Sequence, residues 1–175
     1  ILLNGADGIG TGWSTTIPKY NIADLITYID NKLSNKKKNI ELLPHYNNFK
    51  GEIYYDTETD NCMTVGIINK INETTLNITE LPVGVWNETY YLLLEKMIDD
   101  KFIKSYIKEC TDEEVNITIK IPKENLNSTD DLIDTFKLTS RINMSNMHLF
   151  NKDGKITKYE TVADIADEYY ECRLP

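Results

Sequence analysis

The clearest pattern in the chain is a strict alternation of apolar and polar residues over positions 115–121. Valine or isoleucine stands at every second position, and single polar residues separate them. Because successive side chains of a strand point to opposite faces of a sheet, this alternation predicts a half-buried β-strand, which Pro122 ends. Shorter runs predict further strands at residues 13–17, 54–55, 63–71, 76–78, 102–107, 136–142 and 147–150.

Apolar residues spaced three and four positions apart predict four helices. The first begins after Asn21, a residue suited to capping, and the last begins with a capping box of Thr161 and Asp164. The other two cover residues 88–98 and 123–133. The apolar residues at helical spacing are Ile22, Leu25, Ile26, Ile29 and Leu33 in the first helix and Val162, Ile165, Ala166 and Tyr169, expected to face inward, in the last.

The order of these elements predicts an α+β fold. Helices and strands alternate irregularly, and turn-forming residues at 72–73 and 151–154 join neighbouring strands as local hairpins. We therefore expect a mixed α/β chain with a mainly antiparallel sheet and flanking helices.

The composition is that of a soluble globular protein. Of the 175 residues, 41% are hydrophobic and 27% are charged, which argues against general disorder. No apolar run approaches the roughly 18–20 residues that a membrane-spanning helix needs, and no secretory signal is found. The formal net charge of −9 argues against a protein that coats DNA. Any contact with nucleic acid must then be local.

Two features give opposite indications about the cell compartment. Three cysteines without paired spacing indicate a reduced, intracellular chain. Asn-x-Ser/Thr triplets leave open a secreted glycoprotein or interaction module, although an Asn- and Thr-rich chain produces such triplets by chance. The triplets begin at Asn72, Asn77, Asn87, Asn116, Asn127 and Asn143.

The most conspicuous local feature is a glycine-rich segment at residues 5–12. It has no Gly-Lys-Ser/Thr ending and leads into a strand, so nucleotide binding is the weaker interpretation. Ile9 stands between Gly8 and Gly10. An apolar side chain there is well placed to project as a wedge that unstacks a DNA base step, and the glycines let the backbone approach a sugar-phosphate edge. The alternative, in which Ile9 packs beneath a neighbouring strand, remains open from spacing alone.

Other candidate chemistry is weak. The two histidines, His45 and His148, are far apart and have no cysteine or histidine at metal-ligand spacing. We therefore expect no metal site and no catalytic residue in this chain.

Five sequence blocks together resemble type IIA topoisomerases, especially the eukaryotic and large-virus enzymes. The blocks are GADGIGTGWSTTIPKYN at residues 5–21, LPHYNNFKGEI at 43–53, NITELPVGVWNETY at 77–90, TFKLTSRINMSNMHLFNKDGKITKY at 135–159 and ADEYYECRL at 166–174. The resemblance implies that residues 1–20 are the C-terminal edge of the winged-helix region. It implies that residues 21–175 are the tower domain, ending where a coiled coil starts.

The resemblance also implies roles for individual residues. The isoleucine at the position of Ile9 inserts between base pairs of double-stranded DNA and bends it. Residues that would place the loop or the outer DNA arms against the protein are Gly8, Gly10, Thr11, Trp13, Ser14, Lys19, Lys152, Lys155 and Lys158. Gly84 and Val85 depart from the family pattern, because Arg-Thr is expected there.

The family is a homodimeric enzyme that passes one duplex through a transient double-strand break. The resemblance implies that its nucleophilic tyrosine lies before Ile1, that Mg²⁺ and ATP serve the parent enzyme and that this chain binds neither. It further implies an intracellular location, which is the nucleus for a cellular enzyme or the site of viral DNA replication for a viral one.

Overall fold

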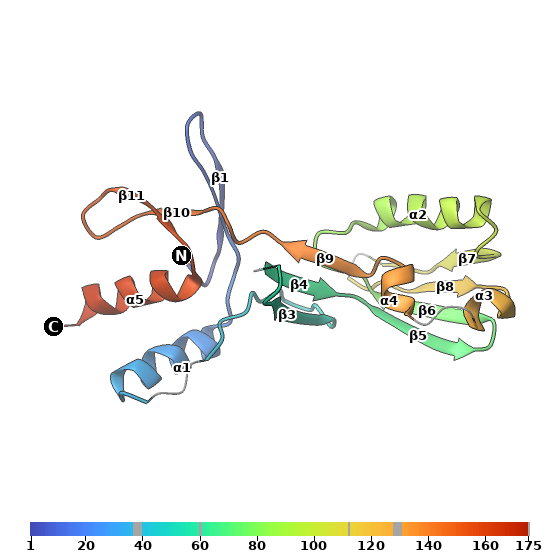
Figure 1. Cartoon of the computed structure of the whole chain (residues 1–175), viewed down its shortest axis with the longest axis horizontal. Helices are drawn as coiled ribbons and strands as arrows, with labels where there is room; N and C mark the ends of the chain where they lie inside the picture. The colour runs from blue at the N-terminus through green and yellow to red at the C-terminus, as the bar shows by residue number, and fades with distance from the viewer. Residues whose placement is uncertain (37–39, 60, 112, 128–130, 175) are drawn as a thin grey trace. The chain divides into compact units, whose positions relative to one another are not determined.

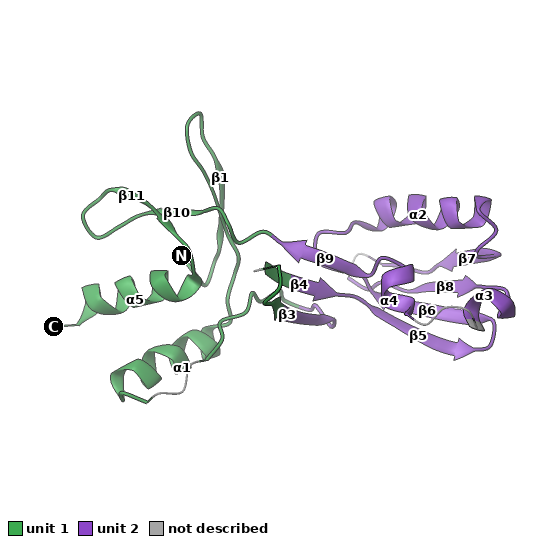
Figure 2. Ribbon diagram, viewed as in Figure 1, with its two compact units in different colours: residues 1–47, 55–62, 143–175 green, residues 48–54, 63–142 purple. Residues whose placement is uncertain are grey.

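The structure, a computed structural model, describes the chain except for residues 37–39, 60, 112, 128–130 and 175. The chain forms two compact units (Figure 2). Unit 1 comprises residues 1–47, 55–62 and 143–175, and unit 2 comprises residues 48–54 and 63–142. Because the chain enters each unit more than once, no linker composition marks a boundary. The family boundary after Tyr20 is a different division and stays a prediction.

Unit 1 contains two β-hairpins and two longer helices (Figure 1). Strands β1 and β2 pair antiparallel, as do β10 and β11. The elements are β1 (Ala6–Ile9), β2 (Ser14–Ile17), α1 (Ile22–Leu33), β10 (Met147–Phe150), β11 (Ile156–Tyr159) and α5 (Val162–Arg173). The core of this unit consists of Leu2, Ile17, Tyr20, Leu42, Met147, Tyr159, Val162, Ile165 and Ala166.

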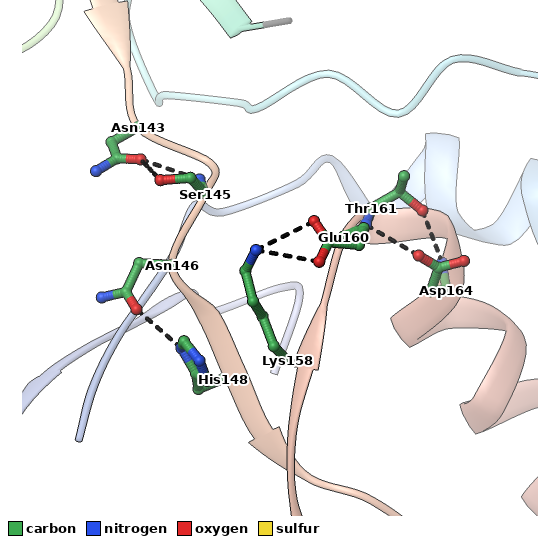
Figure 3. Close-up of polar contacts among 8 residues, drawn as sticks. All are labelled: Asn143, Ser145, Asn146, His148, Lys158, Glu160, Thr161 and Asp164. Atoms are coloured by element: carbon green, nitrogen blue, oxygen red, sulfur yellow. Dashed lines mark hydrogen bonds and ion pairs between the residues drawn. The ribbon is translucent and has the colours of Figure 1, made fainter. Parts of the chain in front are cut away.

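Both predicted caps of unit 1 are confirmed. The Asn21 side chain accepts a hydrogen bond from Ala23 N at 2.8 Å, and Thr161 with Asp164 forms a capping box on α5 (Figure 3). The apolar spacing is a poorer guide to burial. Tyr169, predicted to face inward, is 60% exposed, and no residue of α1 is fully buried. The apolar face of α1 instead lines an open groove of about 540 Å³ with the N-terminal residues and α5.

Unit 2 is built on a four-stranded antiparallel sheet of order β5-β6-β8-β7. Helix α2 packs on this sheet, and the Tyr90 hydroxyl donates a 2.8 Å hydrogen bond to the carbonyl of Phe136. A second sheet has the order β3-β4-β9. The bounds are β3 (Glu52–Asp56), β4 (Asn61–Val65), β5 (Ile67–Asn72), β6 (Thr75–Glu80), α2 (Asn87–Asp99), β7 (Ser105–Lys108), β8 (Ile117–Lys120), α3 (Lys123–Asn127), α4 (Leu132–Thr135) and β9 (Thr139–Ile142).

The predicted α+β class with mainly antiparallel pairing is confirmed, whereas several boundaries are wrong. The strand expected at residues 63–71 is two strands, because Gly66 interrupts it and donates its N–H to the carbonyl of Leu138 at 2.8 Å. The helix expected at 123–133 is α3 followed by α4, with residues 128–130 outside the described part. The strand expected from Phe136 begins at Thr139, since Phe136 is the C-cap of α4.

Candidate nucleic-acid interface

The glycine-rich segment is one arm of a β-hairpin. Ile9 pairs with Ser14 at the end of the β1–β2 ladder, and Gly10 N donates to Trp13 O at 2.8 Å to close the turn. The sequence predicts β2 but assigns β1 to a loop, because glycine is a weak strand former. The turn lies at the end of the hairpin that extends away from the β10–β11 hairpin in Figure 1.

Ile9 projects into solvent. Its side chain is 93% exposed, so the alternative in which it packs beneath a neighbouring strand is not observed. Leaving an isoleucine side chain in water forgoes roughly 1.5–3 kcal/mol of burial free energy. A fully exposed isoleucine at a hairpin end therefore gives this turn an apolar tip without contributing to the core.

The glycines around Ile9 have different structural reasons. Gly5 has a φ of 66°, and a Cβ there would lie 2.8 Å from the carbonyl oxygen of Ile17. A Cβ at Gly10 would lie 3.0 Å from Trp13 O, whereas one at Gly12 would meet nothing within 4 Å. The hairpin thus requires glycine at its base and is open at its tip, where a nucleic-acid backbone has room to approach.

Strand β10 lies beside β2 and supports it. Thr16 N donates to Asn146 O at 2.8 Å, and the Asn146 amide nitrogen donates to Ser14 Oγ at 2.8 Å. The Trp13 and His148 rings lie 5.4 Å apart between centroids. Sequence reasoning missed Asn146 and His148 as neighbours of the hairpin, because they lie more than 130 positions away in the chain and carry no motif.

The remaining predicted contact residues fall in two places. Lys19 follows β2 and is exposed, as are Thr11 and Ser14. The second place is the β10–β11 hairpin, which carries the three other lysines. They are Lys152, Lys155 and Lys158, and all three are exposed.

Carboxylates partly neutralise this basic hairpin. Lys158 Nζ lies 3.0 Å from a carboxylate oxygen of Glu160 (Figure 3), and Lys152 Nζ lies 3.9 Å from one of Glu171. Exposed ion pairs of this kind are worth about 0–1 kcal/mol, so a phosphate competes with them readily. The hairpin is suited to a few local phosphate contacts, in keeping with the acidic net charge.

Hydrogen bonds between hydroxyls and carboxylates fix α5 within unit 1. The Tyr28 hydroxyl on α1 donates to Asp167 at 2.7 Å, and Lys32 forms an ion pair with the same carboxylate. Desolvation and the bond to Asp167 raise the pKa of Tyr28 to about 12. Tyr159 on β11 donates to Glu168, and desolvation with this bond raises its pKa to about 12. These contacts tie α5 to both α1 and the basic hairpin.

The departure from the family pattern at Gly84 and Val85 has a local structural reason. Gly84 has a φ of 84° in a turn where Val85 N donates to Pro82 O at 3.1 Å. An arginine would be strained at that φ. Val85 is partly buried against the core of unit 2.

Several other features bear on alternative functions. Within the described ranges, no group of three His, Cys, Asp or Glu side chains is arranged to hold a metal ion. No helix of the described residues is long and apolar enough to cross a membrane. The Asn77 amide, in one of the glycosylation triplets, is part-buried and donates to Asn116 Oδ1 at 2.7 Å. A glycan attached there would break this bond.

The comparisons with known proteins agree over the whole chain. The family model of DNA gyrase/topoisomerase IV matches residues 1–175. DNA topoisomerase 2 of Plasmodium falciparum is 40% identical over 179 residues, which cover 99% of this chain and 13% of that protein. DNA topoisomerase 2-alpha of Homo sapiens is 35% identical over 182 residues, with 99% of this chain and 12% of that protein covered.

A solved structure agrees as well. The crystal structure of the Plasmodium falciparum topoisomerase II DNA-binding, cleavage and re-ligation domain superposes with a TM-score of 0.86 at 40% identity, over 99% of this chain and 24% of that one. This chain therefore spans a small part of the relatives that it matches. Its full-length match to the family model and its identity to these relatives establish that the chain belongs to the DNA gyrase/topoisomerase IV family of type II topoisomerases.

Proposed function

We propose that this chain is the DNA-bending part of an ATP-dependent type II topoisomerase, and that Ile9 is its wedge. The observation that carries the proposal is the 93% exposure of Ile9 at the end of a hairpin in a member of this family. An apolar side chain inserted between base pairs unstacks them and kinks the duplex. Bending a site of 20–30 base pairs costs of order 1–6 kcal/mol, which burial of a wedge and a few phosphate contacts can offset.

The remaining candidate residues have supporting roles in this proposal. The backbone at Gly8 and Gly10 would approach the sugar-phosphate edge beside the wedge, and Thr11, Ser14 and Lys19 would hold it there. Trp13 lies next to them at the turn. Further out, Lys152, Lys155 and Lys158 would contact the phosphates of a DNA arm. Because few cations are involved, the salt dependence of binding by this region should be shallow.

The parent enzyme would change DNA topology by passing one duplex through a transient double-strand break. We propose that it acts as a homodimer and uses Mg²⁺ and ATP, which bind outside this chain, and that its nucleophilic tyrosine also lies outside. Its location would be intracellular: the nucleus for a cellular enzyme, or the site of DNA replication for a viral one. Alone, this chain would bend DNA weakly and cleave nothing.

The test is DNA bending by the parent enzyme, measured as fluorescence energy transfer across a nicked duplex of about 30 base pairs. Ile9→Ala should reduce the bent fraction at saturating enzyme while the salt dependence of binding stays similar. Ile71→Ala is a matched control, since Ile71 is also a strand isoleucine and is 62% exposed. Bending that is unaffected by Ile9→Ala, or affected equally by Ile71→Ala, would argue against the wedge.

A further inference from the structure

The direction of the β1–β2 hairpin needs an explanation outside the hairpin itself. Its two strands have four residues each, and an isolated two-stranded hairpin is at best marginally stable in water. Two glycines flank Ile9 and a third lies in the turn, which loosens the backbone further. A wedge nevertheless has to be held in one orientation to enter a base step.

The supporting contacts come from β10 and reach β2, the strand opposite Ile9. Thr16 N donates to the carbonyl of Asn146 at 2.8 Å, and His148 N donates to Thr15 Oγ1 at 3.2 Å. These two backbone N–H groups attach the middle of β2 to the start of β10. They leave β1 and the side chain of Ile9 on the other side of the hairpin.

A chain of side chains extends this support to the turn. The Asn146 amide nitrogen donates to Ser14 Oγ at 2.8 Å, and Asn146 Oδ1 lies 2.9 Å from His148 Nδ1 (Figure 3). Because the amide nitrogen of Asn146 is used by Ser14, its oxygen is the acceptor, so Nδ1 of His148 must carry a hydrogen. This bond fixes the imidazole ring, which packs against the ring of Trp13 at an interplanar angle of 57°.

We propose that Trp13, Asn146 and His148 form a brace that positions the wedge. The brace holds the turn against β10 so that Ile9 stays directed outward before DNA arrives. This inference rests on the proposed function of Ile9. It gives Trp13 a role inside the protein: one face of its ring lies against His148, although the side chain is 58% exposed. All three are positioning residues, since none of them has to touch DNA for the brace to work.

The size of the effect follows from the contacts. A tilted aromatic pair and a side-chain hydrogen bond are each worth roughly a factor of two to ten in an equilibrium. His148→Ala removes both, so we expect roughly a fivefold or larger loss in the equilibrium that favours the braced hairpin. His148→Phe keeps a ring against Trp13 and loses only the bond to Asn146, so it should recover a large part of that loss.

The experiment compares the full-length parent enzyme with three variants, His148→Ala, His148→Phe and Phe150→Ala. Phe150 is the matched control: it lies two residues along β10 from His148 and is 72% exposed. Hydrogen exchange without DNA, followed by mass spectrometry on peptides covering residues 13–17, reports the brace directly. DNA bending by fluorescence energy transfer at saturating enzyme reports its consequence, with Ile9→Ala measured in parallel.

The expected result is about fivefold faster exchange and a several-fold lower bent fraction in His148→Ala, partial recovery in His148→Phe and no change in Phe150→Ala. DNA affinity should change less than bending, which a general loss of folding would not produce. Unchanged exchange in His148→Ala would overturn the brace. Faster exchange with normal bending, while Ile9→Ala fails to bend, would show that the brace does not position the wedge. Normal bending in Ile9→Ala would instead overturn the proposed function.

Discussion

Isoleucine occupies two opposite surroundings in this molecule. In the four-stranded sheet of unit 2, Ile78, Ile117 and Ile119 are fully buried beneath α2 and its neighbours, whereas Ile9 in the β1–β2 hairpin of unit 1 is 93% exposed. All four are strand residues, and the surrounding sequence differs more than the residue type does. Around Ile119, apolar residues recur at every second position, while glycines flank Ile9 on both sides.

The difference separates stability from binding. Each buried isoleucine of the sheet contributes about 1.5–3 kcal/mol of transfer free energy to folding, and Ile9 contributes little. Its apolar surface remains available to another molecule. Substitutions in the two regions should therefore affect different measurements, which gives several ways to break or sharpen the comparison.

The largest expected difference is in the free energy of unfolding. Ile119→Ala should lower it by about 2–5 kcal/mol, because it leaves a cavity in the sheet core. Ile9→Ala should change it by less than about 0.5 kcal/mol, as is usual for exposed positions. Urea unfolding of the chain, followed by circular dichroism, measures both. A loss of more than about 1 kcal/mol in Ile9→Ala would mean that Ile9 has a structural role and would break the comparison.

A pair of glycines should show the next largest difference. A Cβ at Gly66 would clash with the backbone carbonyl of Glu80, whereas one at Gly12 would meet nothing within 4 Å. Gly66→Ala should therefore destabilise the chain by about 1–3 kcal/mol, and Gly12→Ala should have almost no effect. Thermal unfolding of the two variants side by side tests this. Equal melting temperatures would contradict the tight packing at Gly66.

A smaller effect is expected at the start of α5. Thr161→Ala removes the side chain that accepts a hydrogen bond from Asp164 N at 3.2 Å, and should cost about 0.5–2 kcal/mol. Thr161→Ser keeps the hydroxyl and is the control. If the two variants unfold at the same urea concentration, the capping box does not stabilise unit 1 as we infer.

The smallest effect is a dependence on alkaline pH that both units should share. Desolvation, followed by hydrogen bonds to Asp167 and Glu95, raises the pKa of Tyr28 and of Tyr106 from 10.0 to about 12. A group whose pKa is raised on folding adds stability that is fully present below its unfolded pKa. That stability is lost as the pH rises from about 10 to about 12.

Replacing either tyrosine by phenylalanine should remove this contribution. In Tyr28→Phe and Tyr106→Phe, the urea midpoint should fall less steeply between about pH 10 and pH 12 than in the parent chain. Below pH 10, all three proteins should show similar slopes. A slope in either variant that matches the parent's across the alkaline range would contradict the assigned hydrogen bonds.

The sheet of unit 2 could be predicted from the sequence because its signal is local. The alternation around Ile119 and the turn residues after Asn72 each specify a strand or a hairpin without reference to distant residues. Antiparallel pairing between neighbouring segments follows from such turns. The strand boundaries near Gly66 and Phe136 were less accessible. Gly66 bonds to a backbone carbonyl far away in the chain, and Phe136 ends a short helix that the apolar pattern does not separate from the strand after it.

The candidate site shows the same limit more strongly. The position of Ile9 between glycines could be read from the sequence, but spacing alone did not distinguish projection from burial. The support from Asn146 and His148 could not be predicted at all, since it depends on β10 lying beside β2. Likewise, the apolar spacing of α1 and Tyr169 predicted burial, yet periodicity reports which residues share a face and not what covers that face.

The central claim is that Ile9 enters a base step of the bound duplex. The most direct measurement is fluorescence of 2-aminopurine placed at successive positions of a duplex of about 30 base pairs bound to the parent enzyme, since unstacking removes the quenching of this base. The account predicts a strong increase at one step on each strand, which disappears in Ile9→Ala and persists in Ile71→Ala. An increase that survives in Ile9→Ala, or no unstacked step while the DNA is bent, would contradict it.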